Sequence, residues 1–337
     1  MADISAEMNS LEPTPVDGLT AFSIIIPTLN EEKHIGACLT RLAALKYPSS
    51  CLEVIVVDNG STDATLEIAI SFATAVNLRV LEKKGVHVSA MRNFAAENAS
   101  GEVLVFLDAD CYVPNDWLLQ AHIVMGGGRR IIAGARYKIP ASSSWVAEAW
   151  YAGRATTKRT PTSYVPSGDL FVPKSLFRSL GGFDESLETN EDYEFCYRAA
   201  TTGVSTLSVP ELAVIHEGTP QSLKAFFRKQ RWHGKHVLRV FLRNIKEAPN
   251  LKAVAFALTF FGCCLSAAAG VGFGLARGNW WLALASVLAL GSIVLMLAVR
   301  DAALKQHWGA LPKIALLYFA FGLARAMCIV NPRNWRA

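Results

Sequence analysis

Short apolar runs alternate with segments of helical periodicity through the first part of this chain. Four such runs lie at residues 22–26, 52–57, 79–81 and 103–107. Helical periodicity follows the first three runs, beginning at about residues 31, 63 and 88. The runs IIIP, VIVVD and VLVFLD are apolar without alternation, as is typical of strands that helices cover on both faces. The pattern therefore predicts an α/β fold with a mostly parallel sheet flanked by helices.

The predicted α/β domain extends to about residue 218. Residues 190–203 predict one helix that ends at Gly203, and residues 204–216 predict two short strands that end at His216. Residues 1–20 are polar and rich in proline, so we expect a flexible tail there. The domain is thus expected to occupy residues 21–218.

The last third of the chain is apolar over much longer stretches. Residues 253–276 and 278–299 carry no charge, and each is long enough to cross a hydrocarbon layer of about 30 Å. Only Arg277 separates them, which predicts a helical hairpin. A third stretch, 314–330, is short and contains Arg325, so it either spans the membrane or lies in its interface. A buried helical subdomain is the alternative, but it would need a large protein core around it.

Composition and charge divide the chain into two chemically different halves. The 337 residues are 52% hydrophobic and carry a formal charge of +5, with a mean hydropathy of +0.27. All but two of the acidic residues precede residue 218, so the remainder is strongly basic. Eight Lys and Arg residues interleave with apolar ones between Gly218 and Lys246, where no acidic residue occurs. We expect basic amphipathic juxtamembrane helices at residues 219–250, suited to anionic membrane lipids rather than to nucleic acid. A solvated helix docked on the domain is the alternative.

The charge pattern also predicts the location and orientation of the chain. Basic residues flank the apolar hairpin on both sides, and the positive-inside rule places both flanks in the cytoplasm. The basic tail with Arg333 and Arg336 favours a cytoplasmic end as well. The first 21 residues contain no Lys or Arg, unlike a signal peptide, and the seven cysteines form no zinc or disulfide pattern. We expect a multi-pass protein of the cytoplasmic membrane whose α/β domain is cytoplasmic.

Paired carboxylates follow the last of the apolar strands. Asp108 and Asp110, in the sequence LDAD, come directly after the run that ends at Leu107. Open α/β sheets bind ligands at the carboxyl ends of their strands, and Asp58 stands at the corresponding place on another strand. Two carboxylates at such an end suit Mg²⁺ or Mn²⁺ holding a diphosphate. The pair is weak evidence alone, because Asp is common in turns.

Other motifs accompany the pair in a defined order. They are PTLNE at 27–31, VDNGSTD at 57–63, AMRN at 90–93, GGFDE at 181–185, Glu191-Asp192, and Gln230-Arg231-Trp232. Over residues 22–240 this set resembles the family-2 glycosyltransferases, which are inverting enzymes of the GT-A fold. The resemblance implies that residues 21–218 form a GT-A catalytic domain.

The resemblance also implies a set of nucleotide contacts. It places Pro27, Asn30 and Glu31 around the nucleotide, Asp58 at the base or ribose, and Arg92 near the nucleotide. Each of three residues has a structural alternative: Pro27 would stop a strand, Asp58 would form a turn, and Arg92 would make an ordinary helix salt bridge.

A metal site and a catalytic base follow from the same resemblance. Asp108 would contact the ribose or the metal, Asp110 would bind the metal, and His216 would be a third ligand. A neutral imidazole suits Mn²⁺ better than Mg²⁺, although a core histidine is an equal alternative. Asp192 would be the base that takes the acceptor proton on the face opposite the leaving diphosphate. Its alternative role is helix capping.

The remaining candidates belong to the acceptor or diphosphate side. Glu191 stands beside the expected base, and Asp169 would read a sugar hydroxyl or cap a turn. Arg231 and Trp232 resemble the end of the Gln-x-x-Arg-Trp motif of processive synthases, but the spacing is two residues shorter. The sequence therefore does not predict processive synthesis.

These observations predict an inverting glycosyltransferase with a nucleotide-sugar donor, UDP-linked in the first instance and GDP-linked in the second. The acceptor would be a lipid-linked saccharide or glycolipid; alternatives are a polyprenyl-phosphate acceptor, or a non-catalytic nucleotide-sugar-binding membrane subunit. A nucleotidyltransferase would need a glycine-rich basic loop after the first strand, where this chain has the acidic sequence PTLNEE.

Overall fold

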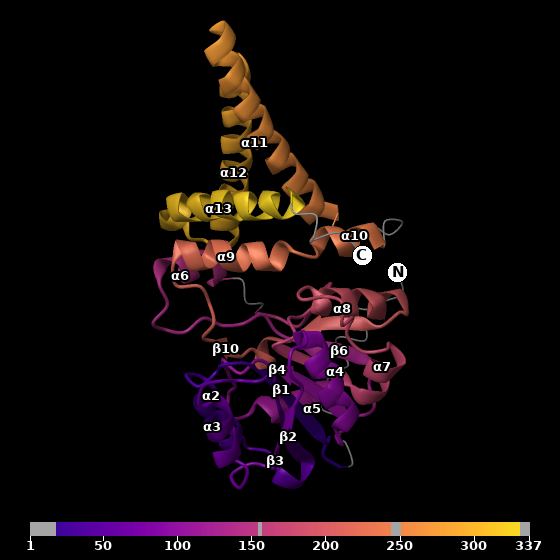
Figure 1. Cartoon of the computed structure of the whole chain (residues 1–337). Helices are drawn as coiled ribbons and strands as arrows, with labels where there is room; N and C mark the ends of the chain where they lie inside the picture. Colours follow the sequence, from indigo (N-terminus) through magenta and orange to yellow (C-terminus); the bar gives the residue numbers. More distant parts are fainter. Residues whose placement is uncertain (1–17, 154–156, 244–250, 331–337) are drawn as a thin grey trace. The chain divides into compact units, whose positions relative to one another are not determined.

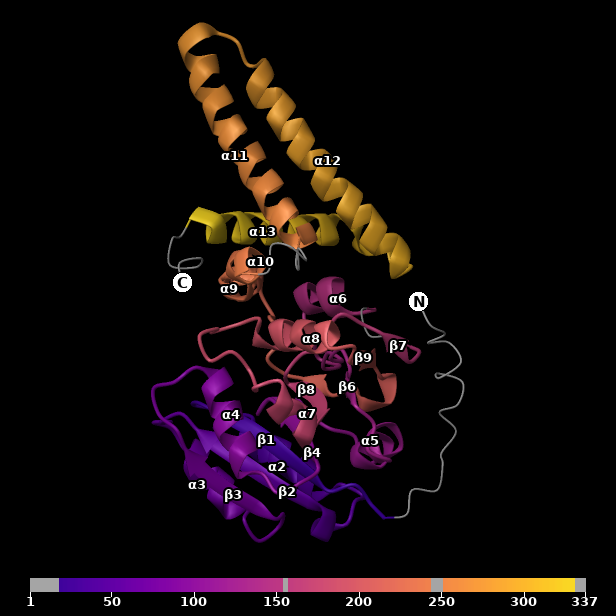
Figure 2. The same cartoon turned by 90° about the vertical axis from the view of Figure 1, so that its right-hand side faces the viewer.

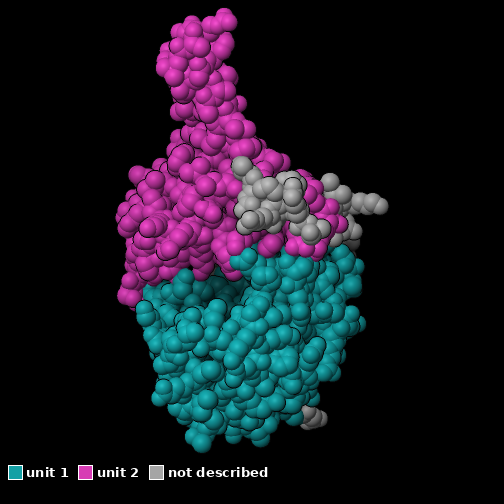
Figure 3. All heavy atoms as spheres, viewed as in Figure 1, with its two compact units in different colours: residues 1–140, 155–218 teal, residues 141–154, 219–337 magenta. Residues whose placement is uncertain are grey.

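The computed structural model describes residues 18–153, 157–243 and 251–330. The chain forms two compact units, coloured separately in Figure 3. The first comprises residues 1–140 and 155–218, and the second comprises residues 141–154 and 219–337. Most of the expected tail, residues 244–250 and the basic C-terminal tail lie outside the described residues.

The first unit contains a mixed eight-stranded sheet in the order β3-β2-β1-β4-β8-β6-β9-β7. Strands β3, β2, β1 and β4 are parallel, as the apolar runs predicted, and they lie side by side in Figure 1. Strand β8 is antiparallel to both β4 and β6. The strands are β1 Phe22–Thr28, β2 Leu52–Asp58, β3 Leu78–Glu82, β4 Val103–Leu107, β6 Ile131–Gly134, β7 Thr160–Pro161, β8 Asp169–Pro173 and β9 Ser205–Ser208.

Helices cover both faces of this sheet because successive strand residues alternate between two apolar cores. Ile24, Val54 and Val105 face one core, together with residues of α2 and α5. Ile25 and Leu104 face the other, with residues of α4, α7 and α8. The helices of this unit are α2 Ile35–Ala43, α3 Thr65–Ser71, α4 Val88–Asn98, α5 Trp117–Met125, α7 Lys174–Ser179 and α8 Glu191–Thr201.

Several element boundaries differ from the sequence prediction. Helix α2 begins at Ile35 rather than near Glu31, and a turn in which the Glu31 carbonyl accepts hydrogen bonds from the His34 and Ile35 amides precedes it. Helix α3 begins at Thr65 rather than at Asp63, whose carboxylate accepts a hydrogen bond from the Thr65 amide. The predicted end of α8 is confirmed: Gly203 follows the helix with φ of 79°.

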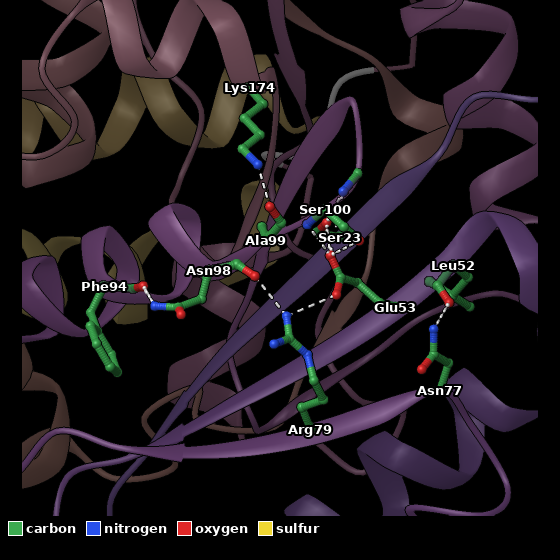
Figure 4. Close-up of polar contacts among 11 residues, drawn as sticks. Ser23, Leu52, Glu53, Asn77, Arg79, Phe94, Asn98, Ala99, Ser100 and Lys174 are labelled. Carbon is green, nitrogen blue, oxygen red and sulfur yellow. Dashed lines mark hydrogen bonds and ion pairs between the residues drawn. The ribbon is translucent and has the colours of Figure 1, made fainter.

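A buried carboxylate joins three strands near their amino ends (Figure 4). Glu53 on β2 accepts hydrogen bonds from the Ser23 hydroxyl at 2.5 Å and from the Ser100 amide and hydroxyl at 2.5 and 2.7 Å. Arg79 on β3 pairs with its second oxygen at 3.1 Å and also donates to the Asn98 carbonyl. Burial raises the pKa of Glu53, but the hydrogen bonds from Ser100, Ser23 and Arg79 outweigh burial and bring it to about 2.

The second unit is helical and very apolar. Helices α11 and α12 form the predicted hairpin, which both Figure 1 and Figure 2 show, and Gly278 follows α11 with φ of 70°. Together with residues 308–329, they are long and apolar enough to cross a membrane. Helix α13 continues without a break through Arg325, and in both views it runs transverse to the hairpin. The helices are α6 Trp145–Tyr151, α9 Leu223–Gly234, α10 Val237–Arg243, α11 Leu251–Arg277, α12 Trp281–Leu304 and α13 Leu311–Val330.

Residues 141–154 belong to this helical unit, although the sequence prediction kept them in the domain at 21–218. Trp150 on α6 packs against Phe226 of α9 and against Tyr318 and Phe321 of α13, with ring centroids 4.9 to 5.4 Å apart. The contacting residues are far apart in the sequence, so composition alone does not predict that they meet.

Candidate active site

The paired aspartates lie at the carboxyl end of the central strands. Strand β4 ends at Leu107, and Asp108 and Asp110 follow it. The short strand β5, Cys111–Tyr112, then pairs with β10, Ile215–His216, in an antiparallel ladder that sets His216 opposite Cys111. As a result, the His216 Nε2 lies 3.7 Å from the Asp110 Oδ1.

The residues at this end fit a divalent cation. Asp110, Cys111 and His216 each offer one ligand atom, and the three atoms lie within 4.8 Å of one another. Two glycines leave room for the carboxylates: a Cβ at Gly168 would clash with Asp108, and one at Gly218 would clash with Asp110. Carboxylate ligands suit Mn²⁺ or Mg²⁺, and an imidazole ligand favours Mn²⁺ of the two. The predicted ligands Asp110 and His216 are thus brought together.

Glu31 shares the electrostatic environment of the paired aspartates. Burial, together with the neighbouring charges of Asp110, Asp108 and Asp63, raises its pKa to about 7. Carboxylates whose mutual repulsion shifts their pKa values are typical of functional sites.

The loops after β1 and β2 hold each other through Asn30. Its side-chain Oδ1 accepts a hydrogen bond from the Thr62 backbone amide at 2.9 Å, and its backbone amide donates to the Ser61 hydroxyl at 2.9 Å. Asp58 is completely buried, and its Oδ2 accepts hydrogen bonds from the Gly60 and Ser61 amides at 2.7 and 2.9 Å. The structure therefore shows Asp58 as the turn former of the two alternatives; its nucleotide contact stays a prediction, as do those of Pro27, which is part of β1, and Asn30.

Arg92 on α4 forms two buried ion pairs. Its Nη2 lies 2.7 Å from the Asp108 Oδ1, and its Nη1 lies 2.7 Å from the Glu191 Oε1. Only 3% of the arginine side chain is exposed, against 31% for Asp108. The salt bridge that was the alternative for Arg92 is therefore present. It joins the paired aspartates to the start of α8.

The predicted base stands at the first turn of α8. Asp192 accepts hydrogen bonds from the Ser167 amide at 3.3 Å and the Tyr193 amide at 2.7 Å, while the Ser167 hydroxyl donates to Glu191 at 2.9 Å. Burial and then the charge of Glu191 raise the pKa of Asp192 to about 7, although its two hydrogen bonds and the charge of Arg92 act to lower it. A carboxyl group with such a pKa can exchange a proton near neutral pH.

Asp169 is enclosed at the start of β8. Its side chain has no exposed surface, and its Oδ2 accepts a hydrogen bond from the Ala135 amide at 3.0 Å. Burial raises its pKa well above the usual range. Its contact with a sugar hydroxyl stays a prediction.

Residues without a motif complete the site. The ring of Tyr137 stacks on His216 with centroids 4.5 Å apart, and its hydroxyl accepts a hydrogen bond from the Gly168 amide at 3.1 Å. Sequence reasoning missed Tyr137, Cys111 and Ser167, since no spacing rule connects them to the paired aspartates. Cys111 was the one with a signal, because it follows the pair directly.

Arg231 and Trp232 lie on α9, in the helical unit, and both are exposed. Gln230, the first residue of the same motif, is buried and accepts a hydrogen bond from Arg325 at 3.4 Å. Their role toward an acceptor or diphosphate stays a prediction.

Comparisons with known proteins identify the family. Residues 23–178 match the glycosyl transferase family 2 model, and residues 103–327 match the model of glycosyl transferase family group 2. The chain belongs to glycosyl transferase family 2. Glycosyltransferase AglE of Haloferax volcanii is 31% identical over 231 residues, which cover 65% of this chain and 74% of the relative. This family-2 chain is therefore a glycosyltransferase, as the motifs predicted.

Two further comparisons agree with the family. A dolichyl N-acetyl-α-D-glucosaminyl phosphate 3-β-D-2,3-diacetamido-2,3-dideoxy-β-D-glucuronosyltransferase of Methanococcus voltae is 27% identical, with 63% of this chain and 71% of the relative covered. The structure of the mannosyltransferase PcManGT from Pyrobaculum calidifontis, in complex with GDP-Man and Mn²⁺, aligns with a TM-score of 0.64. It is 21% identical over 97% of this chain and 94% of that chain, which confirms the GT-A-type fold.

Proposed function

We propose that this glycosyltransferase moves a sugar, with inversion, from a nucleotide-sugar donor to a hydroxyl of a lipid-linked saccharide or glycolipid. One observation carries the proposal: a carboxyl group with a pKa near 7, Asp192, is tied through Ser167, Glu191 and Arg92 to the paired aspartates. The chain thereby holds a proton acceptor and a candidate donor site in one connected network.

The donor would bind at the carboxyl ends of β1, β2 and β4. Mn²⁺ or Mg²⁺ would be held by Asp110 and His216 together with Asp108, and when bound it neutralises charge on the leaving diphosphate. The similar mannosyltransferase structure contains GDP-Man and Mn²⁺, which supports a nucleotide-sugar and a divalent ion here. A UDP-sugar and a GDP-sugar are the two donors to be tested.

Asp192 would take the proton from the acceptor hydroxyl as its oxygen attacks the anomeric carbon. Three hydrogen bonds hold the region in place: two from amides to Asp192, and one from the Ser167 hydroxyl to Glu191. Glu191 is ion-paired with Arg92, whereas Asp192, with its pKa of about 7, can exchange a proton near neutral pH. A positioned general base contributes about 10² to 10⁴ in rate.

A lipid acceptor is supported by the helical unit. Its described residues include three helices long and apolar enough to cross a membrane. On α9, Lys224 and Arg228 are exposed whereas Phe226 is buried, so the helix is amphipathic and basic. The dolichyl-phosphate-linked substrate in the name of the Methanococcus relative points to the same class of acceptor.

We propose that α11 and α12 span the cytoplasmic membrane and that α13 lies in its cytoplasmic interface. The support is that α13 runs transverse to the hairpin and carries Arg325 in its last turns (Figure 2). Two spans place both basic flanks on one side of the membrane, as the positive-inside rule requires. The catalytic unit would then be cytoplasmic.

A polyprenyl phosphate is the alternative acceptor. Its phosphate is already ionised, so attack would need no general base. The retained Asp192, with its pKa near 7, favours the hydroxyl acceptor. The same residue and the retained paired aspartates argue against a non-catalytic binding subunit.

Single-turnover transfer by the full chain in lipid nanodiscs tests the proposal. UDP-, GDP- and dTDP-sugars are first screened for Mn²⁺-dependent hydrolysis, and the active donor is then offered a polyprenyl-diphosphate-linked monosaccharide or a polyprenyl phosphate. We expect transfer to the saccharide to fall about 10²- to 10⁴-fold in Asp192→Asn with unchanged donor affinity. Glu194→Gln on the same helix, where Glu194 pairs with Arg198, is the matched control. Equal rates in Asp192→Asn and wild type with the saccharide would reject the base.

A further inference from the structure

Cys111 lies beside two potential metal ligands, Asp110 and His216. It follows Asp110 directly, is completely buried, and lies opposite His216 in the β5–β10 ladder. Directly opposed residues of an antiparallel pair project their side chains to the same side. The thiol and the imidazole therefore face the same space.

One oxygen of Asp110 is shared between these two side chains. The Asp110 Oδ1 lies 4.0 Å from the Cys111 Sγ and 3.7 Å from the His216 Nε2. Ligand atoms of a tetrahedral Zn²⁺ lie about 3.5 Å from one another, because each is about 2.0 to 2.3 Å from the metal. The Cys111 sulfur and the His216 nitrogen lie within 4.8 Å of each other. Closing the three separations to about 3.5 Å would give a three-residue site with one open position.

The donor set of this trio differs from the rest of the site. Glu31 and Asp108 offer only oxygen, which Mg²⁺ and Mn²⁺ prefer, whereas the trio adds sulfur and nitrogen, which favour Zn²⁺ and Co²⁺. Asp110 and His216 belong to both this trio and the proposed Mn²⁺ or Mg²⁺ site, so Cys111 is what distinguishes the trio. An ion in the trio would therefore exclude the ion that serves the diphosphate.

We propose that Cys111, with Asp110 and His216, forms a thiophilic metal site that binds Zn²⁺-class ions in competition with the Mn²⁺ or Mg²⁺ of the glycosyl transfer site. On binding, the thiol proton leaves to solvent as the sulfur–metal bond forms. The ion enters from the side of Asp110, whose side chain is 19% exposed. Cys111 is then a determinant of metal specificity, and excess zinc is an inhibitor of transfer.

Co²⁺ is the probe, added to the metal-free full chain without any donor. Thiolate coordination gives a sulfur-to-cobalt charge-transfer band in the near ultraviolet, and tetrahedral geometry gives strong visible bands. We expect both in the wild type. Zn²⁺ should abolish them at a concentration at least tenfold lower than Mn²⁺, since Zn²⁺ binds such ligands more tightly.

Three variants decide the assignment. Cys111→Ser should lose the charge-transfer band, and His216→Gln should lose it although Cys111 is intact, which a cobalt ion bound elsewhere to cysteine would not do. Cys51→Ser, at a partly exposed thiol outside the trio, should keep it. A band that persists in Cys111→Ser, or in His216→Gln, overturns the proposal.

Two controls separate the cobalt spectrum from effects on folding and on glycosyl transfer. Cys111 packs in an apolar core, so Cys111→Ala is measured beside the serine variant, and the near-ultraviolet circular dichroism of each is compared with the wild type. If a folded Cys111→Ala keeps the band, the thiol is only a packing residue. Because no donor is present, failure here leaves the proposed transfer intact, and failure of transfer leaves this result intact.

Discussion

Acidic side chains with shifted pKa values lie near both ends of the same parallel strands, and their surroundings are opposite. Near the amino ends, Glu53 meets hydroxyl, amide and guanidinium donors, and its pKa is about 2. At the carboxyl ends, burial together with the charges of Asp110 and Asp108 raises the pKa of Glu31 to about 7. Burial raises the pKa of both groups. The difference between the two pKa values therefore comes from the hydrogen-bond donors that surround Glu53.

The comparison separates a structural carboxylate from a functional one. At Glu53 the chain itself supplies all the positive charge and hydrogen bonds, which fixes β1, β2 and β3 to the loop before β4. At the other end, Arg92 is the cation that contacts the paired aspartates among the ion pairs of the described residues, and it is shared with Glu191. The carboxyl end thus keeps negative charge that a divalent cation would neutralise. Four substitutions test this division.

Asp110→Asn should have the largest effect. The change removes one ligand charge and almost no volume, so we expect Mn²⁺-dependent donor binding to be lost while the fold remains. Calorimetric titration of donor into the full chain, with and without Mn²⁺, measures this. Unchanged affinity in the presence of Mn²⁺ would show that Asp110 is not a ligand.

Asp192→Asn should lower kcat by about 10² to 10⁴ at neutral pH. In the wild type, kcat should rise as the pH increases through about 7, because Asp192 acts only after losing its proton. The variant should lack this rise. A pH profile of kcat from 5.5 to 8.5 is the measurement, where an identical inflection in both proteins would point to another base.

Arg92→Gln should reduce kcat at pH 7 by about tenfold, the effect of losing roughly one charged hydrogen bond. The Arg92 cation lowers the pKa of Asp192, so its removal should move the midpoint of the pH profile upward. Arg92→Lys is the matched control, since it keeps the charge but not both ion pairs. If the midpoint moved equally in the two variants, geometry rather than charge would be responsible.

Glu53→Gln should have the smallest effect on catalysis and a clear effect on stability. Loss of the carboxylate leaves buried donors poorly paired, which should cost about 2 to 4 kcal/mol of unfolding free energy. The folded pKa is about 2, below the ordinary value of 4.5, so the stabilisation is complete above about pH 4.5 and fades as the pH falls toward 2. Denaturant unfolding of both proteins at pH 7 and pH 3 measures this difference, with donor affinity at pH 7 expected to be equal.

Local sequence was sufficient for part of the site. Strands β1, β2 and β4 were predicted because a strand covered on both faces needs an unbroken apolar run, and Asp108 and Asp110 follow from where such a run stops. The hairpin of α11 and α12 was equally evident, since length and hydropathy are additive properties of a segment.

Other parts depended on contacts between distant residues. Strand β8 and the burial of Asp169 follow from antiparallel pairing with β4, which no local pattern marks. Arg92 reaches Glu191 across 99 positions in the sequence.

The sequence by itself therefore determined the fold class, the strand ends that hold the carboxylates and the apolar hairpin, because each depends on residues that are neighbours in the chain. Only the tertiary structure decided which carboxylates lie beside hydrogen-bond donors and which lie beside other carboxylates. It alone set Cys111 beside His216, and it assigned residues 141–154 to the helical unit. The physical reason is that pKa values, ion pairs and ligand sets depend on distances in space, which the chain sets only when it folds.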